Sequence, residues 1–246
     1  MNLILLDAEA QHVRWEVNDR RAVHVREILG LGVGESFFVG VENGLVGKAL
    51  IQKDDASGMA LEVEARWESP APLPIHLLIG LPRPQTARKL LREIPSLGPG
   101  QVTFFLAEKA ERSYQQSKLW TTQEWSDLLR TGAEQAFSTR LPTIHHTASL
   151  AEAIRGVDGD SRIAFDLYET SGTFDRRNVQ GMDRLALAFG PEGGWTPTER
   201  KLLRGSDFEL LGLGPRVLRV ETAVVAATSM AAAFLERLEP PLIPNL

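Results

Sequence analysis

The sequence contains no cysteine, which excludes disulfide bonds, thiolate nucleophiles and cysteine-based zinc sites. Only five histidines are present, and the two adjacent ones, His145 and His146, cannot share one face of a helix. The chain also lacks an apolar run long enough to cross a membrane. Its first residues, MNLILLDAEAQ, lack the basic region of a signal peptide. We therefore expect a cytoplasmic protein without a metal site and without a membrane partner.

An excess of basic residues is also missing, because the formal net charge is -5. Residues 1–70 contain 12 acidic and 7 basic side chains, and residues 71–246 contain 20 of each. Proteins that bind nucleic acid usually carry a basic footprint. Any basic patch on this protein must therefore be local.

A proline-rich stretch divides the chain at residues 69–74, which read SPAPLP. Three prolines in six residues cannot lie inside a helix or a central strand. A chain of 246 residues is also long enough for two domains. We therefore predict one domain over residues 1–70 and another over residues 71–246.

The first domain has the pattern of a small β-barrel. Asn18 or Asp19 can cap a short helix that ends near Leu29. Residues 42–44 predict a hairpin turn between two strands, and residues 61–66 alternate between apolar and polar, as in a half-buried strand.

The second domain alternates apolar strand-like runs with helical patterns. The expected strands are 75–81, 102–107, 162–167 and 185–189, and the expected helices are 85–97, 122–137, 149–155, 197–204 and 221–238. This alternation predicts an α/β fold with a mostly parallel sheet covered on both faces. In such sheets ligands bind beyond the carboxyl ends of the strands.

The first chemical motif is Gly-Pro-Glu-Gly-Gly-Trp at residues 190–195, directly after an expected strand. Three glycines allow the backbone to adopt positive φ and to approach a ligand closely. The stretch is neither a P-loop nor GxGxxG, since no Gly-Lys-Ser/Thr follows. Thr196 or Thr198 can cap the next helix. Alone, the motif predicts a tight strand-to-helix turn as readily as a binding loop.

The second motif, LGPRVLRVETA, occupies residues 213–223 and leads into an alanine-rich helix. Two arginines and one glutamate lie in the loop and first turn. Glu221 would interact favourably with the positive end of the helix dipole. Alone, these charges fit a solvated helix entrance as well as a site.

In combination the motifs resemble those of the SPOUT-class methyltransferases, specifically the RsmE family, which methylates N3 of a uridine in 16S ribosomal RNA. The family's cofactor loop, Ile-Gly-Pro-Glu-Gly-Gly-aromatic, matches residues 189–195. Its last loop, Leu-Gly-x-Arg-Ile-Leu-Arg-Thr-Glu-Thr-Ala, matches residues 213–223, with Val220 in place of the usual threonine. Weaker matches lie at residues 24–29, 111–113 and 133–142. The resemblance covers nearly the whole chain.

The resemblance implies a SPOUT-type parallel sheet with a trefoil knot, a PUA-like RNA-binding β-barrel at the N-terminus, and a homodimer. It also implies S-adenosylmethionine as cofactor, and ribosomal RNA or the small ribosomal subunit as partner. The cofactor-binding residues that it implies are Leu167, Phe189, Gly190, Pro191, Glu192, Gly193, Gly194, Leu213, Gly214, Leu218, Arg219, Thr222 and Ala223.

Methylation of uracil N3 requires loss of its proton, and negative charge then develops on the ring oxygens. Arg219 or Arg216 can stabilise that charge, and Glu221 can act as the base or orient an arginine. The residues expected to contact RNA are basic: Arg26, Arg83, Arg88, Lys89, Arg92, Arg112 and Arg140. Taken singly, each of them also fits a solvated surface.

Three other functions compete with this interpretation. The first is a methyltransferase of the same fold that acts on a different RNA, and the second is a non-catalytic RNA-binding assembly factor. The third, a nucleotide-binding oxidoreductase, is disfavoured because GxGxxG is missing and the glycine loop lies near the C-terminus.

Overall fold

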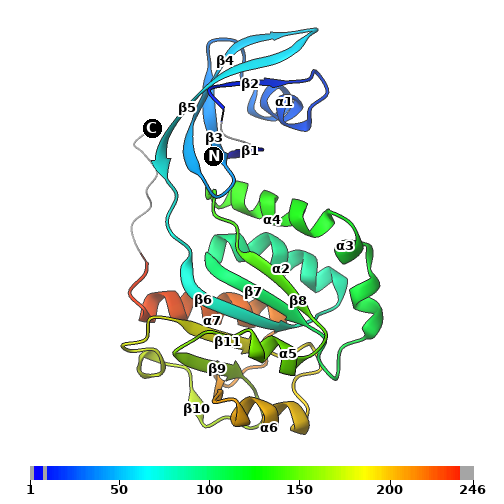
Figure 1. Ribbon diagram of the computed structural model, residues 1–246, viewed down its shortest axis with the longest axis vertical. Helices are drawn as coiled ribbons and strands as arrows, with labels where there is room; N and C mark the ends of the chain where they lie inside the picture. The colour runs from blue at the N-terminus through cyan, green and yellow to red at the C-terminus, as the bar shows by residue number, and fades with distance from the viewer. Residues whose placement is uncertain (1–2, 8–9, 239–246) are drawn as a thin grey trace. The chain divides into compact units, whose positions relative to one another are not determined.

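The computed structural model describes residues 3–7 and 10–238. The chain divides into two compact units (Figure 1). The first comprises Met1–Ala71 and Ala133–Leu141, and the second comprises Pro72–Gly132 and Pro142–Leu246. The segment Ala133–Leu141, which the sequence assigned to the second domain, thus groups with the first.

The first unit is built on a curled sheet with the strand order β1-β3-β4-β5-β2. The strands are β1 (Ile4–Leu6), β2 (His12–Trp15), β3 (Ser36–Val41), β4 (Leu45–Asp55) and β5 (Gly58–Glu68). β1 and β3 are parallel, and the other pairings are antiparallel. The predicted hairpin between β3 and β4 is confirmed, with Asn43 at a φ of 58° in the turn. Trp15, Phe37 and Ile51 belong to the hydrophobic core of this unit.

A short helix lies between β2 and β3 in the chain. α1 (Arg20–His24) begins at Asp19, whose carboxylate accepts a hydrogen bond from the Arg21 amide at 2.8 Å. Of the two caps predicted, Asp19 is therefore the one used. The helix continues as a π-helical turn, η1 (Val25–Leu29), and ends at Gly30 in the left-handed conformation.

Polar contacts attach the segment Ala133–Leu141 to the first unit. The hydroxyl of Thr139 lies 2.7 Å from the carbonyl oxygen of Gly44 and 2.8 Å from the hydroxyl of Ser69, and Thr139 is fully buried. The amide of Leu3 donates to the carbonyl of Glu134 at 3.2 Å. Buried polar groups need such partners, and these partners are far apart in sequence. Hydrophobic periodicity carries no signal for contacts of this kind.

The second unit contains a seven-stranded sheet whose pairings are all parallel, which confirms the predicted α/β fold. Its order is β10-β12-β9-β11-β6-β7-β8. The strands are β6 (Leu73–Gly80), β7 (Pro99–Phe105), β8 (Thr143–Thr147), β9 (Ser161–Phe165), β10 (Gly172–Thr173), β11 (Leu185–Phe189) and β12 (Glu209–Gly212).

Helices connect these strands. They are α2 (Pro84–Leu97), α3 (Lys118–Thr121), α4 (Glu124–Gln135), α5 (Leu150–Arg155), α6 (Pro197–Gly205) and α7 (Val220–Phe234), with 3-10 turns η2 (Arg112–Gln116) and η3 (Arg176–Asn178). α7 packs against α2 and β11 through small side chains, and Ala227 and Ala231 are fully buried.

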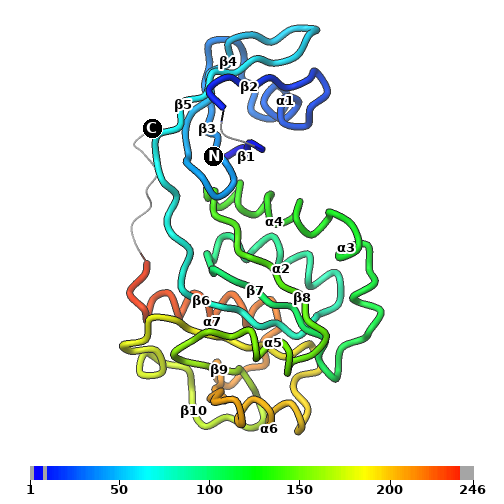
Figure 2. The backbone as a smooth tube through the Cα atoms, viewed as in Figure 1, coloured from blue at the N-terminus to red at the C-terminus, as the bar shows by residue number. Residues whose placement is uncertain are grey.

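The direction of the connections reverses at the centre of the sheet, between β6 and β11 (Figure 2). From β6 the chain passes through α2 to β7 on one side, and from β11 it passes through α6 to β12 on the other. In an open α/β sheet, a crevice forms beyond the carboxyl ends of the strands at such a reversal. By this rule a ligand site is expected where the motif at residues 190–195 begins, directly after β11.

His76 in β6 is a buried histidine, with Nε2 2.8 Å from the Thr103 hydroxyl of β7. Burial and the nearby His145 lower the pKa of His76 to about 4 from its usual 6.5. The unfolded chain therefore binds a proton between these pH values and the folded chain does not. The stability contributed by neutral His76 is complete above about pH 6.5 and is lost as the pH falls toward 4.

We expect His76→Asn to flatten the dependence of stability on pH. The gap between the two pKa values corresponds to a loss of up to about 3 kcal/mol in the wild type at low pH. Urea unfolding of both proteins at pH 7 and at pH 4.5 measures this loss in the free energy of unfolding. An equal loss of stability in wild type and His76→Asn would contradict this role for His76.

Candidate functional site

The loop at residues 190–195 forms a tight turn at the carboxyl end of β11. The amide of Gly194 donates to the carbonyl of Pro191 at 2.8 Å, and Gly194 has a φ of +66°. That conformation favours glycine. Thr196 then caps α6 through a capping box with Glu199, which settles the choice between Thr196 and Thr198.

Gly80, at the end of the neighbouring strand β6, touches this loop directly. A Cβ atom at Gly80 would lie 2.8 Å from both Cδ and N of Pro191. Such contacts are too short for carbon, so only glycine fits at this position without a shift of the loop. Gly80 carries no signal in the sequence, because it lies outside both glycine-containing motifs.

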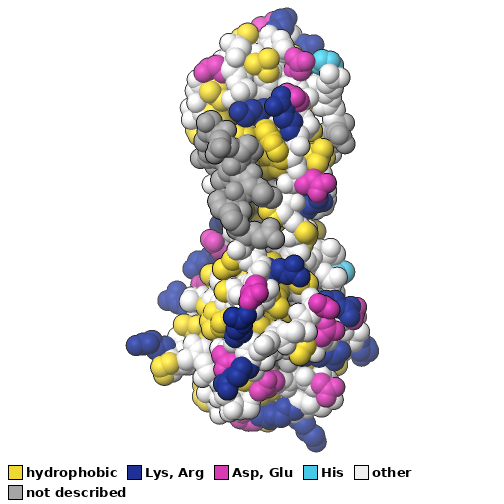
Figure 3. Space-filling view, turned by 90° about the vertical axis from the view of Figure 1, so that its left-hand side faces the viewer, with side chains coloured by type: hydrophobic (Ala, Val, Ile, Leu, Met, Phe, Trp, Pro, Cys, Tyr) yellow, Lys and Arg dark blue, Asp and Glu magenta, His cyan; other side chains and the backbone are white. Residues whose placement is uncertain are grey.

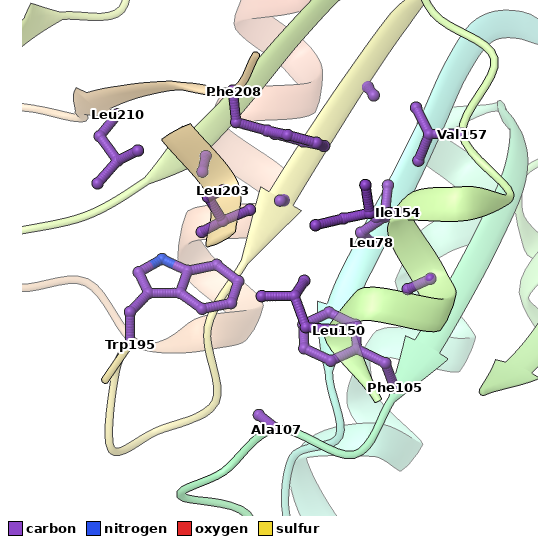
Figure 4. Close-up of a cluster of buried hydrophobic side chains, with 14 residues drawn as sticks. Leu78, Phe105, Ala107, Leu150, Ile154, Val157, Trp195, Leu203, Phe208 and Leu210 are labelled. Atoms are coloured by element: carbon purple, nitrogen blue, oxygen red, sulfur yellow. The ribbon is translucent and has the colours of Figure 1, made fainter. Parts of the chain in front are cut away.

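Lys109 and Trp195 hold the loop from two sides. The Lys109 ammonium donates to the carbonyl oxygens of Gly193 at 2.9 Å and of Trp195 at 3.1 Å. The Trp195 ring is buried, and its Nε1 donates to the carbonyl of Phe165 at 2.8 Å. Trp195 points into the hydrophobic cluster that includes Phe105 and Leu203 (Figure 4). The loop is therefore fixed before any ligand arrives.

Glu192 is oriented by Arg83, which follows β6. Its carboxylate accepts a hydrogen bond from the Arg83 amide at 3.2 Å and lies 3.4 Å from Arg83 Nε. Partial burial and the charges of Glu111 and Glu192 raise the pKa of Tyr114. Glu192, which was expected to bind cofactor, and Arg83, which was expected to bind RNA, thus form one charged cluster beyond the carboxyl ends of β11 and β6.

A cavity of about 260 Å³ lies at the carboxyl ends of β9 and β12. Its lining includes Leu167 after β9 and Gly214 after β12. Both residues were predicted from separate parts of the sequence to bind the cofactor. The volume is slightly below the usual range for small-molecule pockets.

The loop after β12 leads into α7 through Arg216 and Arg219, which are both exposed. Neither guanidinium has a hydrogen bond or ion pair with any residue in the described part of the chain. Gly214 has a φ of +100° and no atom within 4 Å of a Cβ at that position. Backbone and arginine side chains here are therefore accessible to a ligand.

Glu221 in the first turn of α7 is engaged by Lys89 of α2. The Lys89 ammonium lies 3.3 Å from the Glu221 carboxylate, and the Glu221 side chain is 18% exposed. Burial opposes the charged form, but a backbone hydrogen bond, Lys89 and Arg219 hold the pKa of Glu221 below its usual value. A carboxylate stabilised in this way is a weak base. The cation that it contacts in the structure is Lys89, and among the described residues it forms no ion pair with Arg216 or Arg219.

The other residues that were expected to bind the cofactor lie at the carboxyl end of β11 and between β12 and the first turn of α7. Phe189 ends β11 and is buried, Leu213 and Leu218 are half-buried, and Thr222 and Ala223 lie in the first turn of α7. The amide of Ala223 donates to the carbonyl of Arg219 at 2.8 Å.

Several of the basic residues that were expected to contact RNA form ion pairs with acidic side chains. Arg26 of η1 bonds Asp54, with Nη2 2.7 Å from the carboxylate. Arg88 of α2 bonds Glu124, with Nη2 3.1 Å from it. On the face drawn in Figure 3, Lys and Arg side chains are interspersed with Asp and Glu.

The other candidates differ in their surroundings. Arg140 donates to the carbonyl of Asn43 within the first unit. Arg92 of α2 and Arg112 at the start of η2 are exposed. The structure therefore brings Arg83 to the loop at residues 190–195 and Lys89 to the first turn of α7, and it leaves Arg26 and Arg140 in the first unit.

Within residues 3–7 and 10–238 the structure has no group of three or more His, Asp or Glu side chains arranged to hold a metal ion. Over the same residues, no helix combines the length and apolar character needed to cross a membrane.

Comparisons with known proteins agree with this geometry. A family model described as an RNA methyltransferase domain matches residues 69–232. Ribosomal RNA small subunit methyltransferase E of Treponema pallidum is 33% identical over 95% of this chain and 91% of its own length. Ribosomal RNA small subunit methyltransferase E 1 of Borreliella burgdorferi is 28% identical over 96% of this chain and 99% of its own.

Among solved structures, ribosomal RNA small subunit methyltransferase E of Neisseria gonorrhoeae, bound to S-adenosyl methionine, has a TM-score of 0.78 to this chain. The match covers 95% of this chain and 97% of that one at 18% identity. At that identity the likeness shows a shared fold.

Proposed function

Because the chain belongs to the RsmE family, the ribosomal RNA small subunit methyltransferases E, we propose that it methylates N3 of a uridine in 16S ribosomal RNA. The protein is an RNA methyltransferase that takes its methyl group from S-adenosylmethionine. The observation that carries the proposal is the convergence of Leu167, residues 190–195 and residues 213–219 at one edge of the parallel sheet.

The residues at this edge fit the cofactor. A Cβ at Gly194 or Gly214 would meet no atom within 4 Å, so the backbone at both positions faces open space. Exposed backbone N–H and C=O groups suit the edge of an adenine, and Leu213 and Leu218 suit its faces. When bound, the cofactor supplies an activated methyl group on a sulfonium.

In our proposal the basic residues beside the loops act on the uracil. Arg219, with Arg216 as the alternative, stabilises the negative charge that develops on the ring oxygens when N3 loses its proton. Glu221 is held by Lys89, and in the proposal its charge attracts and orients Arg219 once the uracil is bound. Because the methyl donor is already activated, positioning of the uracil nitrogen is the main task that remains for the protein.

The two units divide the work in this proposal. The first unit, a curled sheet with the hairpin at Asn43, serves as a PUA-like RNA-binding barrel. The second is a SPOUT domain with a trefoil knot, active as a homodimer. An enzyme with the small ribosomal subunit as its substrate works in the cytoplasm. Arg83, Arg92 and Arg112 are the contacts that we propose for RNA, since they flank the crevice or are exposed.

Mapping of modified nucleotides in a deletion strain tests the proposed target. We expect one 3-methyluridine to disappear from 16S ribosomal RNA, and to return when small subunits from that strain are incubated with the protein and S-adenosylmethionine. An unchanged 3-methyluridine together with loss of another methylated nucleotide would indicate a different RNA target.

Calorimetry with S-adenosylmethionine tests the cofactor separately. We expect saturable binding, and Gly205→Ala serves as a control variant because no atom lies within 4 Å of the added Cβ. Absence of binding in wild type and control would favour the non-catalytic assembly factor.

A further inference from the structure

The residue that follows β9, Asp166, forms a buried ion pair with Arg200 of α6. Arg200 Nε donates to Oδ2 at 2.5 Å and Nη2 donates to Oδ1 at 3.0 Å. The side chains are 3% and 8% exposed. Removal of two charges from water is costly, and such a pair is often no more stabilising than apolar residues of similar size. A contribution to stability is therefore a poor explanation for its presence.

The same carboxylate fixes the backbone of the loop that follows. The amides of Leu167, Tyr168 and Glu169 donate to Asp166 at 2.8, 3.4 and 3.3 Å. Burial opposes ionisation, yet Arg200 and the Leu167 amide hold the pKa of Asp166 below its usual value. One ionised side chain thus orients three successive peptide groups.

Further contacts attach this loop to its neighbours. Ser171 N donates to the carbonyl of Leu210 in β12 at 2.8 Å. Glu169 accepts from Arg204 of α6 at 2.8 Å, and the guanidinium of Arg200 lies over the Tyr168 ring, 5.6 Å from its centroid. The loop therefore has a defined shape where it lines the 260 Å³ cavity with Asp166, Leu167 and residues 170–173.

The ion pair also joins two parts of the site. Asp166 begins the loop that lines the cavity, and Arg200 lies in the helix that directly follows the loop at residues 190–195. A shift of either element therefore moves the other.

We propose that Asp166 and Arg200 are positioning residues that set the distance and orientation between the loop after β9 and the loop after β11, and thereby the affinity for S-adenosylmethionine. They do so through their ion pair, since both side chains are almost fully buried and neither is needed as a side-chain contact to the cofactor. This inference rests on the proposed function, in that both loops are taken to bind that cofactor. Neither residue is part of the sequence motifs at residues 189–195 and 213–223.

The test compares Asp166→Asn with Asp160→Asn. Asparagine keeps the size and one acceptor oxygen but removes the charge. Asp160 is a matched control, because it also accepts two backbone N–H groups, from Asp183 at 3.2 Å and Arg184 at 3.0 Å, and has an arginine partner at 3.7 Å. It lies at the opposite, amino end of β9.

We expect Asp166→Asn to raise both the calorimetric Kd and the KM for S-adenosylmethionine by about tenfold, the scale of one hydrogen bond to a charged group. We expect kcat at saturating cofactor to change by less than about threefold, since transition-state contacts are kept. Asp160→Asn should leave Kd and KM unchanged. A purely structural role would lower the Tm of Asp166→Asn without this separation of KM from kcat.

Arg200→Lys provides a second variant that retains the charge but cannot form two parallel hydrogen bonds. We expect Arg200→Lys also to raise the Kd for S-adenosylmethionine. We expect the Kd of the double variant to be no higher than that of whichever single variant binds more weakly. Wild-type Kd in both soluble single variants would overturn the inference. Failure of the wild type itself to bind S-adenosylmethionine would instead overturn the proposed function.

Discussion

Arg219→Ala is expected to lower the turnover number for RNA methylation by about 10²-fold, the usual effect of removing one donor that stabilises developing negative charge. The Arg219 guanidinium is exposed and has no partner among the residues that the structure describes, so it is available to a substrate. Its backbone stays in the loop when the side chain is truncated. We therefore expect the Kd for S-adenosylmethionine to change by less than about threefold.

Single-turnover kinetics with saturating cofactor, together with calorimetry, measure the two effects of Arg219→Ala separately. Arg155→Ala, at the exposed end of α5, is the control for loss of a surface arginine. Full turnover with unchanged cofactor binding would remove Arg219 from catalysis. A larger loss in Arg216→Ala would transfer the role to that residue.

Gly80→Ala is expected to weaken binding of S-adenosylmethionine by about tenfold to a hundredfold. The added Cβ would lie 2.8 Å from the Pro191 backbone nitrogen, and backbone cannot move aside as a flexible side chain can. Overpacking of this kind costs about 1–3 kcal/mol, and we expect part of it to appear as displacement of the loop at residues 190–195.

Calorimetry and thermal unfolding of Gly80→Ala and Gly205→Ala check this prediction. The control adds the same methyl group where no atom lies within 4 Å, and we expect it to bind like the wild type. Wild-type affinity in Gly80→Ala would show that the loop tolerates a shift and that close contact with β6 is not needed for binding.

The parts of the fold that could be predicted are those with a local signal. β11 is a continuous apolar run and β9 ends in one, and both were expected within a few residues of their observed bounds. By contrast, β10 and β12 have two and four residues, too few to show periodicity. The capping of α6 was predictable because Thr196 and Glu199 have the spacing of a capping box.

In the candidate site, too, the residues with a local signal in the sequence were predicted and those without one were not. The motifs at residues 190–195 and 213–223 stood out by their glycines and charges, and their resemblance to the RsmE family made them the predicted cofactor site. Lys109 and Gly80 were missed because they contact the loop at residues 190–195 from the turn after β7 and from the end of β6, and only the folded sheet brings them there. The ion pair of Asp166 and Arg200 was missed for the same reason, since neither neighbouring sequence indicates a buried charge.

The insertion of β11 between β6 and β9 has a consequence for the order of folding. The partner of Leu185 in β6 is Ile75, so this pairing closes a very long stretch of chain. Pairings of such high contact order form slowly. Until β11 is inserted, the hydrogen-bonding edges of β6 and β9 stay open and Trp195 has no core to enter. The chain therefore gains the ability to bind a ligand at the same step that closes its sheet.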